Sequence, residues 1–429
     1  MHDRPTNVRW LIVLLLMGFA FQGHFNRVGI SVAGDEKFIK SGEISATQMG
    51  AVYTSFLIVY TAMMVPGGWL IDRIGPRRAL TCTGLGLGFC VVLTGALGWF
   101  SWPIAALLGP LIAIRGTAGA LSAPLHPAAA RVVSLWIPLP RRVMANGLVT
   151  AGAVLGVAAT NPAFGWLMDK LDWPLAFVVS GATYMLFALV WSRLATDTPA
   201  DHPWINSSER MLTDFPATPP AQFAPLHNLL ELVQNRGLVF LTLSYAALSY
   251  LQYMFFYWSK YYFANVIKMS VPDSRQAAFE VNMAMAFGMA CGGYLTDIFA
   301  GLFGRRYGYR TVAIAGMGFS AAFAWAGIST TDANLVVLCF ALAFFALGSC
   351  EGVFWTTAPL LHKRGGGLAG AFLNFIGNAG GLVSPLITPW IGEEFGWGVA
   401  VAVACCICGL GAVFWLWIDP EPARDVAAT

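Results

Sequence analysis

The stretch Pro66–Arg78, PGGWLIDRIGPRR, decides the fold of this 429-residue chain. Apolar segments of membrane-spanning length precede and follow it, so the stretch is predicted to be a short polar hairpin between two helices. Its cations Arg73, Arg77 and Arg78 predict a cytoplasmic hairpin, because Lys and Arg accumulate on that side of a membrane. The glycine pair allows two helix ends to approach closely, and Asp72 can pair with an arginine or with a helix N-terminus.

A second copy of this hairpin occurs 225 residues later. The stretch Gly292–Asp297 repeats the spacing Gly-Gly-aromatic-Leu-x-Asp, and Arg305 and Arg306 follow it. A second repeated feature places Pro162 near the end of the fifth apolar run and Pro385 near the end of the eleventh, 223 residues apart. Matching offsets of this kind predict two halves of common origin.

The pattern Gly68-x-x-x-Asp72-Arg73-x-Gly75-x-Arg77-Arg78 resembles the loop signature of the major facilitator superfamily. The resemblance implies an all-α integral membrane protein with twelve transmembrane helices in two pseudo-symmetric bundles of six. It also implies transport by alternating access around a site between the bundles. In such a carrier, Asp72, Arg73 and Asp297 of the two hairpins would make gate contacts.

The composition independently predicts a polytopic membrane protein. Hydrophobic residues make up 57% of the chain and charged residues only 11%, whereas soluble domains carry about 25% charged residues. Apolar runs long enough to cross a bilayer recur along the whole length. The net charge of +3 is too small to indicate a nucleic-acid partner. The expected spans are 9–33, 46–70, 79–100, 103–130, 144–168, 173–195, 237–263, 277–300, 311–329, 334–361, 368–392 and 396–418.

These spans define the predicted domains and the orientation. Residues 1–195 form an N-terminal six-helix bundle, residues 237–429 form a C-terminal one, and the proline-rich segment 196–236 is interpreted as a cytoplasmic linker. Of the 25 Lys and Arg residues, 17 lie on one predicted side and 6 on the other. This bias predicts a monomeric protein of the cell (inner) membrane with both termini in the cytoplasm. The first run is expected to remain as an uncleaved helix.

Three full charges lie well inside predicted spans: Arg27, Arg115 and Glu351. Each costs at least about 2.5–3.5 kcal/mol at mid-membrane, so each needs a partner or a water-filled cavity. One interpretation is a structural salt bridge between Glu351 and one arginine, which still leaves the other arginine over. The alternative is a substrate or ion pathway. Because a guanidinium offers a planar fork of donors, an arginine that faces a cavity predicts an anionic substrate.

The runs Phe25–Ala33 and Ala369–Gly381 resemble the first and eleventh helices of the anion:cation symporter family. That family contains bacterial sugar-acid permeases and animal vesicular carriers of glutamate, sialic acid and phosphate. Tyr60, Arg115 and Tyr253 match its second, fourth and seventh helices. The resemblance implies that Arg27 and Arg115 contact a substrate carboxylate and that Tyr60 and Asn374 contact hydroxyl groups. The remaining candidate substrate contacts are Tyr253, His24 and Asn378, the last lying one helical turn beyond Asn374.

The chain departs from the sugar-acid members of that family at several positions. His24 stands where they have Tyr, Asn26 where they have Asp, Ser122 where they have a proton-coupling Glu, and Ala153 where they have a polar amide. The proton-coupling acid is therefore missing from its expected place. We expect an anion other than a standard hexonate.

Two residues are candidates for carrying a proton instead. Glu351 is the one acid within a predicted span, and His24 lies one helical turn before Arg27 and titrates near physiological pH. Each has a simpler interpretation: Glu351 pairs with an arginine, and His24 hydrogen-bonds a neighbour. His126 lies between Pro124 and Pro127 and is interpreted as structural.

The eight cysteines all fall inside apolar runs, and their spacing predicts no metal site. The group Cys405, Cys406 and Cys408 is interpreted as small apolar packing rather than a reactive cluster. No nucleotide-binding motif, nucleophile–base motif or cofactor motif is present in the sequence.

The leading functional hypothesis is a secondary transporter that imports an organic anion together with a proton, or with another cation. An anion exchanger or a facilitated carrier is an alternative. A drug/proton efflux antiporter fits less well, since Val157 stands where its fifth-helix motif has proline after Gly152-x-x-x-Gly156. A membrane-embedded enzyme fits least well.

Overall fold

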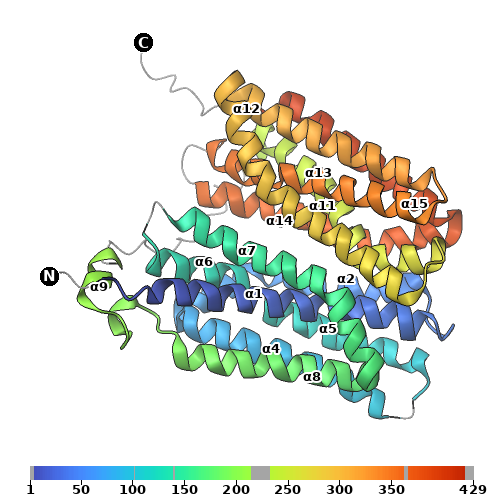
Figure 1. Cartoon of the computed structure of the whole chain (residues 1–429), viewed down its shortest axis with the longest axis horizontal. Helices are drawn as coiled ribbons and strands as arrows, with labels where there is room; N and C mark the ends of the chain where they lie inside the picture. The colour runs from blue at the N-terminus through green and yellow to red at the C-terminus, as the bar shows by residue number, and fades with distance from the viewer. Residues whose placement is uncertain (1–3, 101, 139–140, 214–231, 362–365, 421–429) are drawn as a thin grey trace. The chain divides into compact units, whose positions relative to one another are not determined.

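The computed structural model describes residues 4–100, 102–138, 141–213, 232–361 and 366–420, and the regular structure within these ranges is helical (Figure 1). Internal contacts divide the chain into two units, Met1–Pro220 (unit 1) and Ala221–Thr429 (unit 2). The boundary falls within the predicted linker 196–236, of which residues 214–231 lie outside the described ranges.

Unit 1 holds the first six predicted spans. Its helices are α1 (Val8–Ala33), α2 (Ala46–Ala62), α3 (Met64–Ile74), α4 (Pro76–Ala96), α5 (Leu108–Ser122), α6 (Leu125–Trp136), α7 (Arg142–Ala159), α8 (Gly165–Leu194) and α9 (Ser207–Thr213). Short helical turns extend or join them: η1 (Gly34–Ile39), η2 (Leu97–Trp99), η3 (Ile104–Leu107), η5 (Thr160–Phe164) and η6 (Pro199–Asp201). The main helix pairs are α1 with α7, α2 with α5 and α4 with α8.

Unit 2 holds the remaining spans. Its elements are α11 (Arg236–Tyr261), η7 (Tyr262–Val266), α12 (Val271–Ile328), α13 (Ala333–Leu360), α14 (Gly366–Phe395), α15 (Trp397–Phe414) and η8 (Trp415–Trp417). Here α11 packs against α14, and α12 packs against α13 and α15. The pairing of the first span with the fifth, and of the third with the sixth, therefore recurs in both units.

The described helices account for the predicted number of spans. Eight segments are long and apolar enough to cross a membrane, and a ninth consists of Ala46–Ala62 and Pro66–Ile74, which meet at 57°. Two of the eight are interrupted, one at Asp172 and one at Gly304, where the backbone leaves the helical region. The 58-residue α12 would be roughly three bilayer cores long if it were straight, so it contains two spans. Counting each interrupted segment as two spans, and the 30-residue α14 as one, gives twelve.

Two predicted spans differ in detail from the observed helices. The span predicted over 46–70 bends after Ala62, and the span predicted over 103–130 is divided between α5 and α6 at Ala123 and Pro124. Proline explains both departures, because Pro66 and Pro124 lack the N–H that an uninterrupted helix requires.

Glycines allow the helices that flank α1 and α11 to pack closely. A Cβ atom at Gly156 of α7 would collide with the carbonyl oxygen of Phe21 in α1. A Cβ atom at Gly380 of α14 would collide with the carbonyl oxygen of Ala246 in α11. Small residues give the same close backbone approach in many membrane helix pairs. Both contacts hold the helices that carry candidate site residues.

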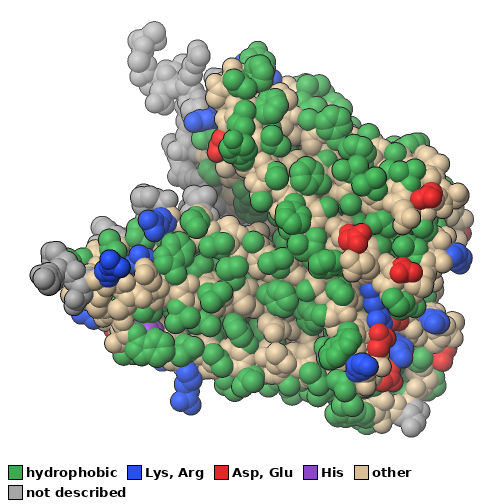
Figure 2. Space-filling view, viewed as in Figure 1, with side chains coloured by type: hydrophobic (Ala, Val, Ile, Leu, Met, Phe, Trp, Pro, Cys, Tyr) green, Lys and Arg blue, Asp and Glu red, His purple; other side chains and the backbone are tan. Residues whose placement is uncertain are grey.

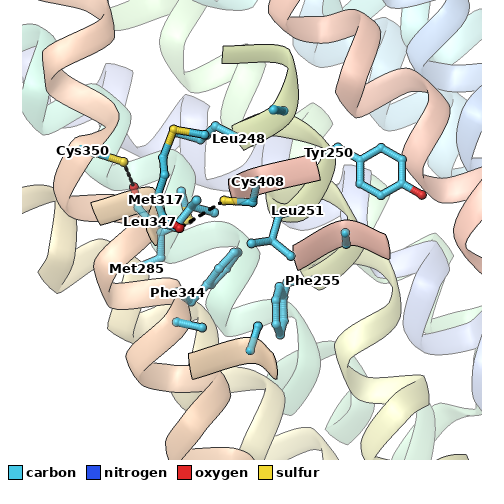
Figure 3. Close-up of a cluster of buried hydrophobic side chains, with 14 of the residues drawn as sticks. Leu248, Tyr250, Leu251, Phe255, Met285, Met317, Phe344, Leu347, Cys350 and Cys408 are labelled. Atoms are coloured by element: carbon cyan, nitrogen blue, oxygen red, sulfur yellow. Dashed lines mark hydrogen bonds between the residues drawn. The ribbon is translucent and has the colours of Figure 1, made fainter. Parts of the chain in front are cut away.

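The core of unit 2 is a cluster of apolar side chains between α11, α12, α13 and α15 (Figure 3). Phe255 and Phe344 stack with ring centroids 4.9 Å apart. The thiol of Cys350 donates to the carbonyl oxygen of Leu347 at 3.1 Å. Cys405 and Cys408 are buried in the same cluster, as expected of small apolar residues that fill a core.

The outer surface is apolar where the helices are long. On the face shown in Figure 2, hydrophobic side chains cover the helices of unit 1, and charged side chains gather near α9 and at the opposite end of the helices. Leu14, Phe89 and Leu186 are among the large side chains that are more than half exposed. A surface of this kind is suited to contact with the hydrocarbon core of a lipid bilayer.

Candidate functional site

The two predicted anion-binding arginines lie on opposite sides of one aromatic ring. Arg27 is on α1 and Arg115 is on α5, and both are buried. The Cζ atom of Arg27 lies 5.1 Å from the ring centroid of Phe56, and that of Arg115 lies 4.9 Å from the same centroid. Arg27 is also 5.5 Å from the ring centroid of Tyr60. Contact with aromatic faces stabilises a cation that has left water.

Arg115 is tied to the backbone of α1. Its Nη2 donates to the carbonyl oxygen of Arg27 at 2.6 Å, and its Nη1 lies 3.5 Å from the carbonyl oxygen of Asn26. These bonds use carbonyl groups of an adjacent helix as acceptors for a buried charge. Arg115 therefore holds α5 against α1, in addition to any contact with a substrate.

A cavity within unit 1 opens beside Arg27. The side chains that matter for its chemistry are His24, Arg27, Phe56, Tyr60, Ser122 and His126. The lining contains one fixed positive charge, hydroxyl and imidazole groups, and neither Asp nor Glu among the residues described. Arg115 is not among the described lining residues. The arrangement can hold a small anion against Arg27 while hydroxyl groups bind its polar substituents.

Two histidines meet in this cavity. The rings of His24 and His126 have centroids 5.1 Å apart with their planes inclined at 64°. The Nδ1 atom of His24 lies 3.0 Å from the carbonyl oxygen of Ala20. Sequence reasoning placed His24 near the substrate and interpreted His126 as structural, but both rings line the same cavity. The flanking prolines drew attention to the helix break and away from the ring.

Two further positions of interest have well-defined partners. Asn26 is buried and accepts a hydrogen bond from Ser180 of α8 at 2.7 Å, while its amide donates to the carbonyl oxygen of Gln22 at 2.9 Å. Ser122 lines the cavity and donates to the carbonyl oxygen of Ala118 at 2.7 Å. A hydroxyl group thus lies in the cavity at the position where a carboxylic acid was sought.

Glu351 of α13 binds neutral donors in unit 2. Its Oε1 accepts a hydrogen bond from the hydroxyl of Tyr245 at 2.5 Å and one from Trp355 Nε1 at 3.3 Å. Its Oε2 is buried and has no hydrogen-bond partner among the described residues. Within the same part of the chain Glu351 forms no salt bridge with an arginine. The salt-bridge interpretation therefore has no support in unit 2.

The three polar candidates of α11 and α14 form a connected set. The hydroxyl of Tyr253 lies 3.5 Å from Asn378 Oδ1, and the amide of Asn378 donates to Asn374 Oδ1 at 3.0 Å. Next to them, Trp258 Nε1 donates to the carbonyl oxygen of Pro385 at 3.2 Å. The polar side chains predicted at these positions thus lie together where α11 packs on α14.

A family model described as Major Facilitator Superfamily matches residues 8–300 and 295–429 of the chain. The chain belongs to this superfamily. It is a multi-pass membrane transporter rather than an enzyme.

Relatives of this major facilitator chain are carriers of organic anions. It is 28% identical over 399 residues to a protein of Bacillus subtilis named "Probable galactarate/D-glucarate transporter", covering 90% of this chain and 86% of that protein. It is 24% identical to a D-galactonate transporter of Escherichia coli, with 98% of both chains covered. It is 26% identical to a "Probable sulfoacetate transporter" of Cupriavidus necator, with 96% and 94% covered. These relatives confirm the resemblance to sugar-acid carriers of the anion:cation symporter family.

Solved structures share the fold. A bacterial homologue of the human lysosomal transporter Spinster, in an inward-facing and unoccupied conformation, aligns with a TM-score of 0.76 at 16% identity over 97% of both chains. A D-xylose–proton symporter aligns with a TM-score of 0.71 at 13% identity, covering 96% of this chain and 98% of that one.

In this major facilitator carrier, the predicted gate residues are exposed. Asp72 and Arg73 lie at the end of α3, where the guanidinium of Arg73 is 5.2 Å from the ring centroid of Trp69. Asp297 is exposed on α12. An acid that sequence reasoning missed, Asp197, binds the hairpin instead, since its Oδ1 accepts the backbone N–H of Arg77 at 3.0 Å.

Unit 2 has a corresponding contact at its own hairpin. Arg306 pairs with Asp419 at 3.5 Å, and Arg310 Nε donates to the carbonyl oxygen of Ile418 at 2.7 Å. In each unit, therefore, an arginine that follows the hairpin turn contacts the chain just beyond the last span of that unit. Asp197 and Asp419 are 222 residues apart, close to the offset of the other repeated features, and this spacing was the available signal.

The segment that follows α8 also contacts the start of α1. Glu209 of α9 is fully buried and accepts hydrogen bonds from the backbone N–H groups of Val8 and Arg9, each at 3.0 Å. It also accepts from the hydroxyl of Thr6 and pairs with Arg9 Nη1 at 3.2 Å. Because Asn7 makes no capping bond with its side chain, Glu209 supplies the acceptor that the N-terminus of α1 needs.

Proposed function

We propose that this protein is a secondary active transporter that imports an organic carboxylate, of the sugar-acid type, by proton-coupled symport through alternating access. It would act in the cell (inner) membrane with both termini in the cytoplasm. The observation that carries the proposal is the cavity beside Arg27, where a buried guanidinium meets hydroxyl groups and no described lining residue is an acid. Such a site favours an anion with polar substituents.

Each candidate residue has a role in this proposal. Arg27 binds the carboxylate, and Tyr60 binds a hydroxyl group of the substrate. Arg115 keeps α5 in register with α1 and adds positive potential behind Phe56. In unit 2, Tyr253, Asn374 and Asn378 supply further polar contacts.

Glu351 is proposed to take up the coupling proton. Its carboxyl group is held by Tyr245 and Trp355, which are neutral, so no fixed cation in unit 2 locks it in the ionised form. Protonation would remove a buried charge and would lower the barrier to closing the carrier. Asp72, Arg73 and Asp297 would make and break contacts as the cytoplasmic side opens.

Uptake into proteoliposomes tests the proposal. Labelled galactarate, D-galactonate, D-glucuronate and sulfoacetate would be supplied with and without an inward proton gradient. We expect uptake of at least one anion to rise with the gradient. Arg27→Lys should reduce uptake by about tenfold or more, because one lost charge-assisted pair is worth about 1.5–3 kcal/mol. Arg193→Lys, at an exposed position in the last turn of α8, is the matched control.

Proton coupling is tested separately. Glu351→Gln should remove the dependence on the gradient, while Glu280→Gln, at an exposed position of α12, should keep it. Uptake by the wild-type protein that ignores the gradient would contradict symport. Stimulation of uptake by unlabelled anion inside the vesicles would then identify an exchanger, and its absence a facilitated carrier. Full uptake by Arg27→Lys would contradict the anion site itself.

A further inference from the structure

The histidine pair in the cavity of unit 1 has no role in the function proposed above. His24 comes from α1 and His126 from α6, so two helices that are distant in sequence bring the rings together. Both rings line the cavity that contains Arg27. Since imidazole is the side chain whose ordinary titration spans physiological pH, the pair is a place where a proton can be bound and released.

The hydrogen bonding of His24 identifies the nitrogen that would accept the proton. Its Nδ1 lies 3.0 Å from the carbonyl oxygen of Ala20. A carbonyl oxygen only accepts, so Nδ1 must carry the hydrogen. The neutral ring therefore keeps its lone pair on Nε2, and an incoming proton would bind there.

The surroundings link that proton to an anion. The charged or titratable groups on the elements packed around the pair are Arg27 of α1, Tyr60 of α2, Cys90 of α4, Arg115 of α5 and Tyr184 of α8. Arg27 opposes a second positive charge, and each imidazole opposes a proton on the other. No described lining residue is an acid that could offset this charge. An anion held by Arg27 would supply the missing negative charge.

We propose that His24 and His126 together bind one proton, and that this proton and an anion at Arg27 favour each other's binding. The inference rests on the proposed function, because it requires the cavity to bind an organic anion. It adds a proton site in unit 1 to the one proposed at Glu351 in unit 2. The coupling is reciprocal: protonation raises the affinity for the anion, and the anion raises the affinity for the proton.

Binding calorimetry on the purified full-length protein in lipid nanodiscs tests this coupling. Galactarate, D-galactonate and sulfoacetate are the probes, and two buffers of different ionisation enthalpy report the protons taken up with each anion. In the wild-type protein we expect net proton uptake, and an affinity that falls by up to about tenfold per pH unit as the pH rises through the titration of the pair.

The variants separate the two proton sites. His24→Gln combined with His126→Gln should abolish the proton uptake and flatten the pH dependence of affinity. Glu351→Gln should retain both in the binding assay. The matched control is His202→Gln, because His202 lies outside the cavity and packs against Trp136. Proton uptake that survives in the double variant, or that disappears only in Glu351→Gln, would overturn the inference and leave the anion-transport proposal standing.

A second measurement decides the case in which none of the probes binds, which would count against the proposed function. Nitrogen-15 NMR of the six histidines follows the protonation of each ring, assigned by single substitutions. We expect His126→Gln to change the titration midpoint of His24, and His24→Gln to change that of His126. Two midpoints that are each unchanged by loss of the other ring would overturn the pair as one proton site.

Discussion

Gly75 and Gly304 adopt the same positive-φ conformation at corresponding turns of the two units. Gly75 has φ 82° and ψ 154°, and Gly304 has φ 77° and ψ 159°. Each follows a Gly-Gly-aromatic-Leu-x-Asp hairpin and precedes the third helix of its unit. This region of backbone space is open to glycine and strained for other residues. The internal repeat therefore extends from the sequence to individual backbone angles.

The two turns should not tolerate a side chain. Gly75→Ala and Gly304→Ala should each destabilise the protein by about 1–3 kcal/mol, the usual cost of a strained backbone region. Gly75→Ala should be the worse of the two, because the added Cβ would also meet Asp197 Oδ1 at 2.8 Å, whereas the space around Gly304 is open. Thermal unfolding in detergent measures the effect.

The motif supplies its own controls. A Cβ atom at Gly68 or at Gly293 would meet no atom within 4 Å, and both glycines lie within helices. Gly68→Ala and Gly293→Ala should be neutral or slightly stabilising, since alanine favours the helix. If these controls are as unstable as the turn variants, positive φ is not the cause.

Asp172 occupies a comparable turn without being a glycine. Its φ is 58° and its ψ is 166°, and its carboxylate pairs with Lys37 at 2.8 Å. Asp172→Gly and Asp172→Ala both lose that pair, but only glycine relieves the backbone. The melting temperature of Asp172→Gly should therefore exceed that of Asp172→Ala by the equivalent of about 1 kcal/mol. Equal melting temperatures would show that the turn is not strained.

The fold was predictable because hydropathy and repeated motifs are properties of the chain itself. Apolar runs fixed the number of spans, and the hairpin copies located the two halves. The bend near Pro66 and the division at Pro124 were missed because hydropathy continues across them. The positive-φ turn at Asp172 was also missed, since aspartate at a turn has many possible conformations.

Glu209 should make the stability of unit 1 depend on pH. Burial raises its pKa, but hydrogen bonds from Thr6 and from the backbone N–H groups of Arg9 and Val8, together with the charge of Arg9, outweigh burial and lower the pKa below its usual value. The contact is thus fully stabilising above the pKa of the unfolded chain, near ~4.3. It is lost as the pH falls through the lower pKa of the folded protein.

Glu209→Gln tests this expectation. The variant should be less stable than wild type at neutral pH by about 1–3 kcal/mol, because buried donors lose a charged acceptor. The difference should shrink as the pH is lowered below ~4. Unfolding at several pH values measures it, with Glu280→Gln as an exposed control. A difference that does not change with pH would argue against an ionised Glu209.

The two buried arginines should differ in what their loss does. Arg115→Gln removes the bond to the carbonyl oxygen of Arg27 and should lower both stability and transport. Arg27→Gln should lower transport with a smaller effect on stability, since Arg27 lines the cavity. Melting temperature and anion affinity, measured on the same samples, separate the roles. Equal losses of stability would show that Arg27 is as structural as Arg115.

The candidate site was only partly predictable. Arg27, Arg115 and Glu351 stood out because charge is rare in a membrane span. Phe56 did not, because an aromatic residue in an apolar run carries no distinguishing signal, yet it lies against both guanidinium groups. The contact of His126 with His24 depends on how α6 packs against α1, which no local pattern reveals.

The contact of Glu209 with the first residues of α1 also bears on how the protein can be divided. A fragment that stops where α8 ends, at Leu194, would leave the start of α1 without its acceptor, whereas one that continues to Thr213 would keep it. Separate expression of the two halves, and their recombination in the membrane, should therefore succeed with a break placed after α9 and fail with one placed directly after the sixth span.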